Sequence, residues 1–123
     1  MSEIPTTVAE AYLNTVSRVP DHEAVVSADG RRFTYQQLNV EVERLALALH
    51  ALDCRPGDRV AVWLSNSPEW VIAEYAAALL GVVIVPLNAR FRADEAADIL
   101  TRGRAKVLIT QPNFLSNDYL ERL

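Results

Sequence analysis

The fold is decided by residues 56–88, which read PGDRVAVWLSNSPEWVIAEYAAALLGVVIVPLN. An apolar run at 59–64 is followed by a polar loop, a long apolar segment at 69–80 and a second apolar run at 82–85. This succession predicts a strand, a loop, a helix and a second strand. Two strands joined through a helix run parallel and make a right-handed crossover. Because neither strand alternates apolar with polar residues, we expect both faces of the sheet to be covered.

The predicted helix at 69–80 has almost no polar face, so it should be buried on most sides. Ser67 is placed to cap it, Pro68 suits its first turn, and Glu69 complements the helix dipole. Gly81 ends it. A chain of 123 residues has little mass with which to bury such a helix. We therefore expect the chain on its own to expose a large apolar patch.

The residues before this stretch predict a helix, a hairpin and a second helix. Thr6 and Thr7 can cap the first helix, which runs to about Arg18. Its apolar face comprises Val8, Tyr12, Leu13 and Val16. Asp29 and Gly30, between two short runs at 24–27 and 31–33, indicate a tight hairpin turn.

Thr34 and Gln37 have the spacing of a capping box for the second helix. The apolar stripe of that helix comprises Leu38, Val42, Leu45, Leu49 and Leu52. The helix should end near Asp53, where a turn leads into the first parallel strand.

The alternation continues after residue 88. A polar loop at 89–92 precedes a helix that starts at Asp94 and Glu95 and has Gly103 as its C-cap. Its inward residues are predicted to be Ala96, Ala97, Ile99 and Leu100. A third strand at 106–110, a turn at 111–113 and a helix at 114–123 complete the chain. Residues 1–123 therefore predict one α/β domain, a layered fold with a parallel β-α-β-α-β sheet plus an N-terminal helix and a β-hairpin.

The composition narrows the class of protein. Half of the residues are hydrophobic, which indicates a globular chain. The net charge of −4 and the single lysine argue against nucleic-acid binding. Cys54 is the only cysteine, which excludes an internal disulfide and a multi-cysteine metal site. No apolar run is long enough for a transmembrane segment and the N-terminus does not read as a signal peptide, so we expect a cytoplasmic protein.

Three segments resemble the N-terminal region of the AMP-forming adenylating enzymes, which include acyl-CoA synthetases, peptide-synthetase adenylation domains and luciferases. The segments are FTYQQLN at 33–39, GDRVAV at 57–62 followed by NSPEW at 66–70, and LGVVIVPLNAR at 80–90. Their order and spacing cover nearly the whole chain. The Pro-Leu-Asn-x-Arg form of the third segment is more similar to the acyl-CoA synthetase branch. One departure is Asp53, where the family often has glycine; aspartate tolerates a left-handed conformation better than most residues.

The resemblance implies part of the large N-terminal domain of a ligase that joins a carboxylic acid, a fatty acid first, to CoA through an acyl-adenylate. It implies ATP, CoA and Mg²⁺ as cofactors of the parent enzyme. The family's phosphate loop, ribose-binding aspartate, hinge and catalytic lysine have no counterpart in these residues. We therefore expect an N-terminal fragment, and an incomplete domain, that is inactive alone and binds none of these cofactors well.

No catalytic group or metal ligand is predicted within the chain. Ser67 is expected to be a helix cap, and His22 and His50 are expected on solvated faces. Cys54 lies in a predicted turn, where Arg55 is the only neighbouring cation in the sequence, so we expect no reactivity. Trp63 and Trp70 are interpreted as core residues.

Arg90 is the candidate binding residue, because it follows a buried strand on a polar loop and has a planar fork suited to phosphate. The resemblance implies that it lies where the CoA nucleotide phosphates dock. The alternative is a structural arginine that pairs with Asp94 or Glu95 or lies along Phe91. Asn88 is expected to support the loop.

A different class of function stays open at this point. The chain could be a free-standing, non-catalytic α/β module that acts through its apolar surface. Such a surface would form a homodimer or bind a partner protein.

Overall fold

A computed structural model describes residues 4–111, 113–114 and 117–118. The elements, in order, are α1 (Val8–Arg18), β1 (Glu23–Val26), β2 (Arg32–Thr34), α2 (Tyr35–Ala51), β3 (Arg59–Trp63), α3 (Pro68–Leu80), β4 (Val83–Pro86), α4 (Ala93–Gly103), β5 (Val107–Thr110), β6 (Asn113–Phe114) and β7 (Asn117–Asp118). Across these residues, no helix combines the length and the apolar character needed to span a bilayer.

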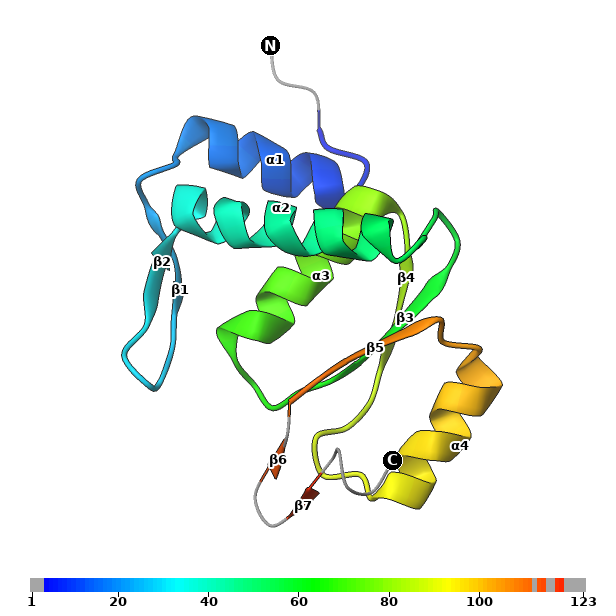
Figure 1. The fold of residues 1–123 in the computed structure, drawn as a ribbon. Helices are drawn as coiled ribbons and strands as arrows, with labels where there is room; N and C mark the ends of the chain where they lie inside the picture. Colours follow the sequence, from blue (N-terminus) through cyan, green and yellow to red (C-terminus); the bar gives the residue numbers. More distant parts are fainter. Residues whose placement is uncertain (1–3, 112, 115–116, 119–123) are drawn as a thin grey trace.

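The strand β3 lies at the centre of a parallel sheet in the order β4-β3-β5. Val60 is paired with Ile84 of β4 and with Val107 of β5. Alternate residues of β3 face opposite sides of the sheet. Val60 packs in a cluster with α2 and α3, whereas Ala61 and Trp63 pack in a cluster with α4. The predicted parallel sheet with both faces covered is therefore confirmed (Figure 1).

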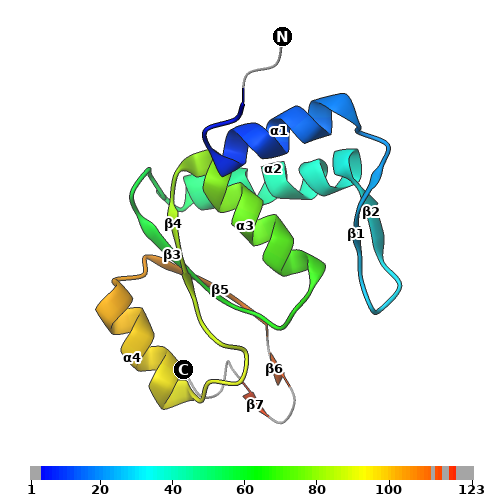
Figure 2. The ribbon, with the colours of Figure 1, turned by 180° about the vertical axis from the view of Figure 1, so that it is seen from behind.

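The helix α3 is enclosed by the sheet on one side and by α1 and α2 on the other (Figure 2). Each of its apolar residues is buried or half-buried, and only Glu69 and Glu74 are exposed. The expectation that the chain is too small to bury this helix was wrong, because the two N-terminal helices supply the cover. Tyr12 of α1 contributes directly, since its ring stacks on Tyr75 of α3 at 4.3 Å and its hydroxyl donates to Asn39 of α2 at 2.8 Å.

Among the described residues, half of the exposed large apolar side chains lie on α1 and α2. Val8, Leu13 and Leu52 were expected to face inward, yet they are 58%, 45% and 58% exposed. Helical spacing places these residues on the predicted faces, but the part of the chain that the structure describes leaves all three exposed. Val40 and Leu47, two turns apart on one face of α2, are also exposed.

The predicted helix caps of α1 and α2 and the predicted hairpin turn are confirmed. The Thr7 side chain accepts a hydrogen bond from the main-chain N–H of Glu10. At α2, Thr34 accepts from the N–H of Gln37 at 3.1 Å, and the Gln37 side chain accepts from the N–H of Thr34 at 2.9 Å. The hairpin of β1 and β2 is antiparallel, with Gly30 at φ 95° in its turn.

The end of α2 uses the left-handed residue that the sequence suggested. The helix stops at Ala51, and Asp53 adopts φ 65°. The Asp53 carbonyl accepts a hydrogen bond from the Lys106 ammonium, which also lies 3.3 Å from the Asp58 carboxylate. Asp58 has a pKa below its ordinary value, first because its carboxylate accepts the Arg55 N–H and then because Lys106 is near.

The end of α4 differs from the prediction. Gly103 is the last helical residue, and Arg104 is the C-cap at φ 52°. Close packing favours glycine at position 103, because a Cβ there would lie 3.3 Å from the Val85 side chain. Ala97, predicted to face inward, is exposed, while Ala96 is buried.

The predicted C-terminal helix at 114–123 is wrong where it can be compared. Residues 113–114 and 117–118 form the antiparallel pair β6 and β7. The other residues of that predicted helix, and Pro112 of the predicted turn, lie outside the described residues.

Candidate functional site

The carboxyl ends of the three parallel strands meet at one edge of the sheet. The chain leaves β3 at Leu64, β4 at Leu87 and β5 at Gln111. Open α/β sheets bind ligands at this edge, outside the carboxyl ends of their strands. Polar side chains gather there, which makes it the candidate site.

Hydrogen bonds tie the β5 end to the loop after β3. The Thr110 hydroxyl donates to the Trp63 carbonyl at 2.9 Å. The Gln111 side-chain oxygen accepts from both the N–H and the hydroxyl of Ser65, each at 2.9 Å. Ser67 stands at the N-cap of α3, but its hydroxyl donates to the Ser65 carbonyl at 3.0 Å and makes no capping bond. The predicted position of the cap is therefore correct and its hydrogen bond is not.

The loop after β4 is folded around Asn88. The Asn88 side-chain oxygen accepts from the Arg90 N–H at 2.9 Å, and its carbonyl accepts from the Phe91 N–H at 3.0 Å. The same carbonyl accepts from the indole N–H of Trp63 at 3.0 Å. Asn88 thus joins the loop to itself and to the central strand.

Arg90 presents its side chain to solvent from this loop. With the residues that the structure describes, its guanidinium makes no hydrogen bond or ion pair. The neighbouring acids pair with another arginine, since Arg92 lies 3.8 Å from Asp94 and 3.2 Å from Glu95. The alternative in which Arg90 pairs with those acids is therefore not what the structure shows.

A cavity of about 550 Å³ opens at the same edge, between the hairpin turn and the loop after β3. Its polar lining includes Ser27, Asp29, Arg31, Asn66 and Gln111. The guanidinium of Arg31 is already engaged by Asp29 and Glu69. The cavity therefore has no uncommitted cation among its described lining residues with which to hold an anion.

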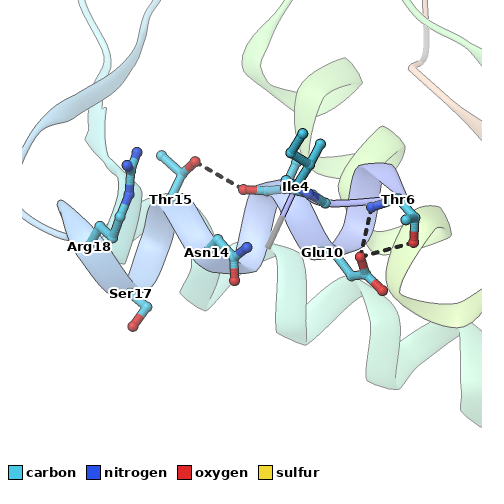
Figure 3. Close-up of a pocket in the computed structure, with 9 residues that line it drawn as sticks. Ile4, Thr6, Glu10, Asn14, Thr15, Ser17 and Arg18 are labelled. Carbon is cyan, nitrogen blue, oxygen red and sulfur yellow. Dashed lines mark hydrogen bonds between the residues drawn. The ribbon is translucent and has the colours of Figure 1, made fainter. Parts of the chain in front are cut away.

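A larger hollow of about 750 Å³ lies on the exposed face of α1, away from the sheet edge (Figure 3). The Glu10 carboxylate there accepts from the N–H of Thr6 at 2.9 Å and from its hydroxyl at 3.2 Å. These bonds hold the pKa of Glu10 below its ordinary value. Thr6 and Glu10 are used at the start of α1, and the Thr15 hydroxyl donates to the Ala11 carbonyl at 2.9 Å. We assign no site to this hollow.

The remaining candidates occupy structural positions. Cys54 is 1% exposed, inside the core rather than in an open turn, and such thiols are inert. His22 and His50 are exposed, as expected. Trp63 is buried and Trp70 is half-buried, so their assignment to the core is confirmed. Among the described residues, no group of three His, Cys, Asp or Glu side chains could hold a metal ion.

Sequence reasoning missed the residues that shape this edge. Trp63, Thr110 and Gln111 act through contacts between segments far apart in the chain. The signal that could have found them is positional, because each stands at or just beyond the end of a parallel strand.

The fold and the sheet edge define an open α/β architecture with its ligand loops at the carboxyl ends of parallel strands. Comparison with known families specifies the class of protein, since residues 13–122 match the profile described as AMP-binding enzyme. The chain belongs to this family. The resemblance of its three motifs to adenylating enzymes is thereby confirmed.

Relatives that match over most of the chain are CoA ligases. The 3-[(3aS,4S,7aS)-7a-methyl-1,5-dioxo-octahydro-1H-inden-4-yl]propanoyl:CoA ligase of Mycobacterium tuberculosis is 45% identical over 112 residues, covering 91% of this chain and 22% of that ligase. The crotonobetaine/carnitine–CoA ligase of Salmonella paratyphi A is 40% identical over 84 residues, covering 68% of this chain and 16% of that ligase. The chain thus spans about a fifth of the length of the first relatives it matches.

Solved structures give the same fold. The inhibitor-bound N-terminal domain of FACL13 from Mycobacterium tuberculosis superposes with a TM-score of 0.80 at 36% identity, covering 85% of this chain and 26% of that one. The N-terminal subdomain of NpsA from Klebsiella oxytoca, in complex with anthranilyl-AMSN, gives a TM-score of 0.78 at 29% identity, with 85% and 27% covered. The predicted fold class, part of the large N-terminal domain of an adenylate-forming enzyme, is confirmed.

Proposed function

We propose that this chain is part of an ATP-dependent, AMP-forming ligase that joins a carboxylic acid to CoA. The observation that carries the proposal is the 45% identity to a named CoA ligase over 91% of the chain. The chain contributes half of a sheet, the helices that cover it and one wall of the CoA path. Residues 1–123 are an incomplete domain in this proposal and have no ligase activity alone.

The proposed reaction has two steps. A carboxylate oxygen of the acid attacks the α-phosphorus of ATP, which forms the acyl-adenylate and releases pyrophosphate. The sulfur of CoA then attacks the acyl carbonyl carbon, and AMP leaves. Negative charge builds on the phosphoryl oxygens and then on the carbonyl oxygen, so both steps need cationic stabilisation. Mg²⁺ supplies part of it in the first step, and no described cluster of this chain is suited to hold that ion.

Arg90 is the residue of this chain that we assign to CoA, through a contact with its nucleotide phosphates. An exposed guanidinium without a described partner, at the ligand edge of a parallel sheet, supports this role. Asn88 supports the contact by holding the Arg90 main chain at 2.9 Å. Arg90 should therefore act in the second step, thioester formation, and not in the first, adenylate formation.

Two classes of acid are consistent with the relatives. A structure entitled fatty acyl CoA synthetase, from Mycobacterium tuberculosis, is 36% identical with a TM-score of 0.79, which supports a fatty acid. The first relative acts on a propanoate attached to a two-ring system. We propose a fatty acid first and an alicyclic propanoate second, in a cytoplasmic enzyme.

A grafted ligase tests the proposal. Residues of this chain replace the matching 22% of the Mycobacterium tuberculosis relative, and acyl-CoA formation is measured with ATP, CoA and Mg²⁺. We expect the graft to make acyl-CoA with the relative's own acid, while the chain alone releases no pyrophosphate with a panel of fatty and alicyclic acids. A folded graft that forms no adenylate, or turnover that scales with the purified chain, would contradict the proposal.

A second candidate function is a non-catalytic module that self-associates as a homodimer. The observation that favours it is the exposed apolar pair Val40 and Leu47 on α2, at 47% and 71% exposure. Sedimentation velocity over a wide concentration range measures whether the chain dimerises through this surface. Dimerisation that Leu47→Glu abolishes would support the module, whereas a strictly monomeric chain would exclude it.

A further inference from the structure

Trp63 connects the core to the loop that carries Arg90. It ends β3 and is 1% exposed, and its ring packs with Leu87 and Ala96 on the α4 side of the sheet. A buried indole needs a hydrogen-bond acceptor. Trp63 finds it in the main-chain carbonyl of Asn88, at 3.0 Å.

The hydrogen bonds inside the loop fix its shape but not its place. The Arg90 N–H donates to the Asn88 side chain, and the Phe91 N–H donates to the Asn88 carbonyl. Both bonds lie within four consecutive residues, so the turn could tilt as a unit without breaking either. Its position relative to the sheet must come from contacts outside the turn.

Contacts with β3 supply that position. The Leu87 N–H donates to the Val62 carbonyl at 2.9 Å, which continues the strand pairing by one residue. The Trp63 indole adds a second attachment at Asn88, one residue further along. Phe91, at the far end of the turn, packs against the cluster that contains Trp63 and Leu87. The indole bond adds an attachment at Asn88 itself, and these contacts together restrict tilting of the turn. Arg90 lies two residues beyond the second attachment.

We propose that Trp63 is a positioning residue for CoA binding, which acts through Asn88 to aim the Arg90 guanidinium at the phosphates. This inference rests on the CoA contact proposed above. The indole N–H has the positioning role, and the ring has a separate role in core packing. Trp63→Phe keeps an aromatic ring in the core, removes the donor to Asn88 and also shortens the ring, so its effect on CoA binding is read beside its effect on stability.

The test uses the grafted ligase, because the chain alone is expected to bind CoA poorly, and CoA is the probe. Binding is followed by NMR through the Arg90 side-chain Nε–H signal, which reports on the contact itself and not on stability. We expect Trp63→Phe to weaken CoA binding at Arg90 about three- to tenfold, the effect of one hydrogen bond. The matched control is Trp70→Phe, the same change at the half-buried tryptophan of α3, which should bind as wild type.

The outcomes separate this inference from the function on which it rests. Equal affinity in wild type and Trp63→Phe, with both folded at the measuring temperature, would overturn the positioning role and leave the CoA contact standing. An Arg90 signal that CoA does not move in the graft with the wild-type residues, or that moves equally with pantetheine, would overturn the CoA contact and this inference with it. Weaker binding in both tryptophan variants would overturn the positioning role, since loss of packing would then explain it.

Discussion

Arg31, just after the hairpin turn, and Glu69, in the first turn of α3, form a two-point ion pair although they lie 38 positions apart in the sequence. The second of the two bonds joins Nη2 to Oε2 at 3.1 Å, while the Nε of Arg31 donates to Asp29 at 2.9 Å. The pair fastens the hairpin to the start of α3 beside the loop after β3. It therefore borders the same sheet edge as the candidate site.

Glu69→Gln should reduce stability in a pH- and salt-dependent way. The pKa of Glu69 lies below its ordinary value of 4.5, chiefly because its carboxylate accepts hydrogen bonds from Arg31. A lowered carboxylate pKa contributes stability that is present above pH 4.5 and is lost as the pH falls through the folded-state value. Urea unfolding should show a small difference between wild type and variant at neutral pH, and a smaller one in strong acid or high salt.

The control for that change is Glu74→Gln, on the same helix at an exposed position without an ion pair among the described residues. It should leave the acid dependence unchanged. If both variants altered the acid limb equally, the effect would come from net charge and not from the pair with Arg31.

Thr34→Ala should destabilise the chain by about 0.5–2 kcal/mol, because it removes the acceptor of the α2 capping box. Thr34→Ser keeps the acceptor and should stay close to wild type. Reversible urea unfolding measures both. An alanine variant within error of wild type would mean that tertiary contacts hold this helix end without the cap.

Arg104→Gly should stabilise the chain by about 0.5–1 kcal/mol. Glycine adopts the left-handed conformation without the strain that arginine has there, and this gain is larger than the extra conformational entropy that glycine loses on folding. The matched control is Arg102→Gly in the last turn of α4. It should be destabilising by about 1 kcal/mol, because glycine weakens a helix interior, and it also removes the ion pair with Asp98. Thermal unfolding that moved both variants in the same direction would contradict the left-handed cap.

Tyr12 should make the fold sensitive to alkali. Burial, with smaller effects from Tyr75 and Glu43, raises its pKa from 10.0 to about 12. A raised pKa contributes stability that is complete below pH 10 and is lost as the pH rises through about 12. The loss should be on the order of 2 kcal/mol across that window. Tyr12→Phe should flatten the alkaline limb of the stability curve, and an unchanged limb would place the effect at Tyr75.

The element order could be predicted because its signals are local. The capping box at Thr34, the turn at Gly30 and the apolar runs of β3 and β4 each involve neighbouring residues. Burial of α3 was underestimated because its cover comes from helices earlier in the chain. Periodicity placed Val8 on the apolar face of the first helix and Leu52 on that of the second, but it carries no information on whether anything covers those positions.

The site was predictable only in part. Asn88 and Arg90 were found because they follow a buried strand, which is a property of position. Their link to Trp63 spans 25 residues and depends on strand register, which the sequence does not specify. Arg104 was missed in favour of Gly103, because glycine is the commoner C-cap and its actual constraint is the contact with Val85.

The proposed CoA contact of Arg90 is tested most directly by comparing CoA with pantetheine, which lacks the nucleotide phosphates, as thiol acceptors of the grafted ligase. We predict that Arg90→Ala lowers kcat/KM for CoA about tenfold, the scale of one charged hydrogen bond. The value for pantetheine and the rate of adenylate formation should stay unchanged, and Arg102→Ala should change none of the three. An Arg90→Ala graft that uses CoA as well as the parent graft, or that loses CoA and pantetheine equally, would contradict the assignment.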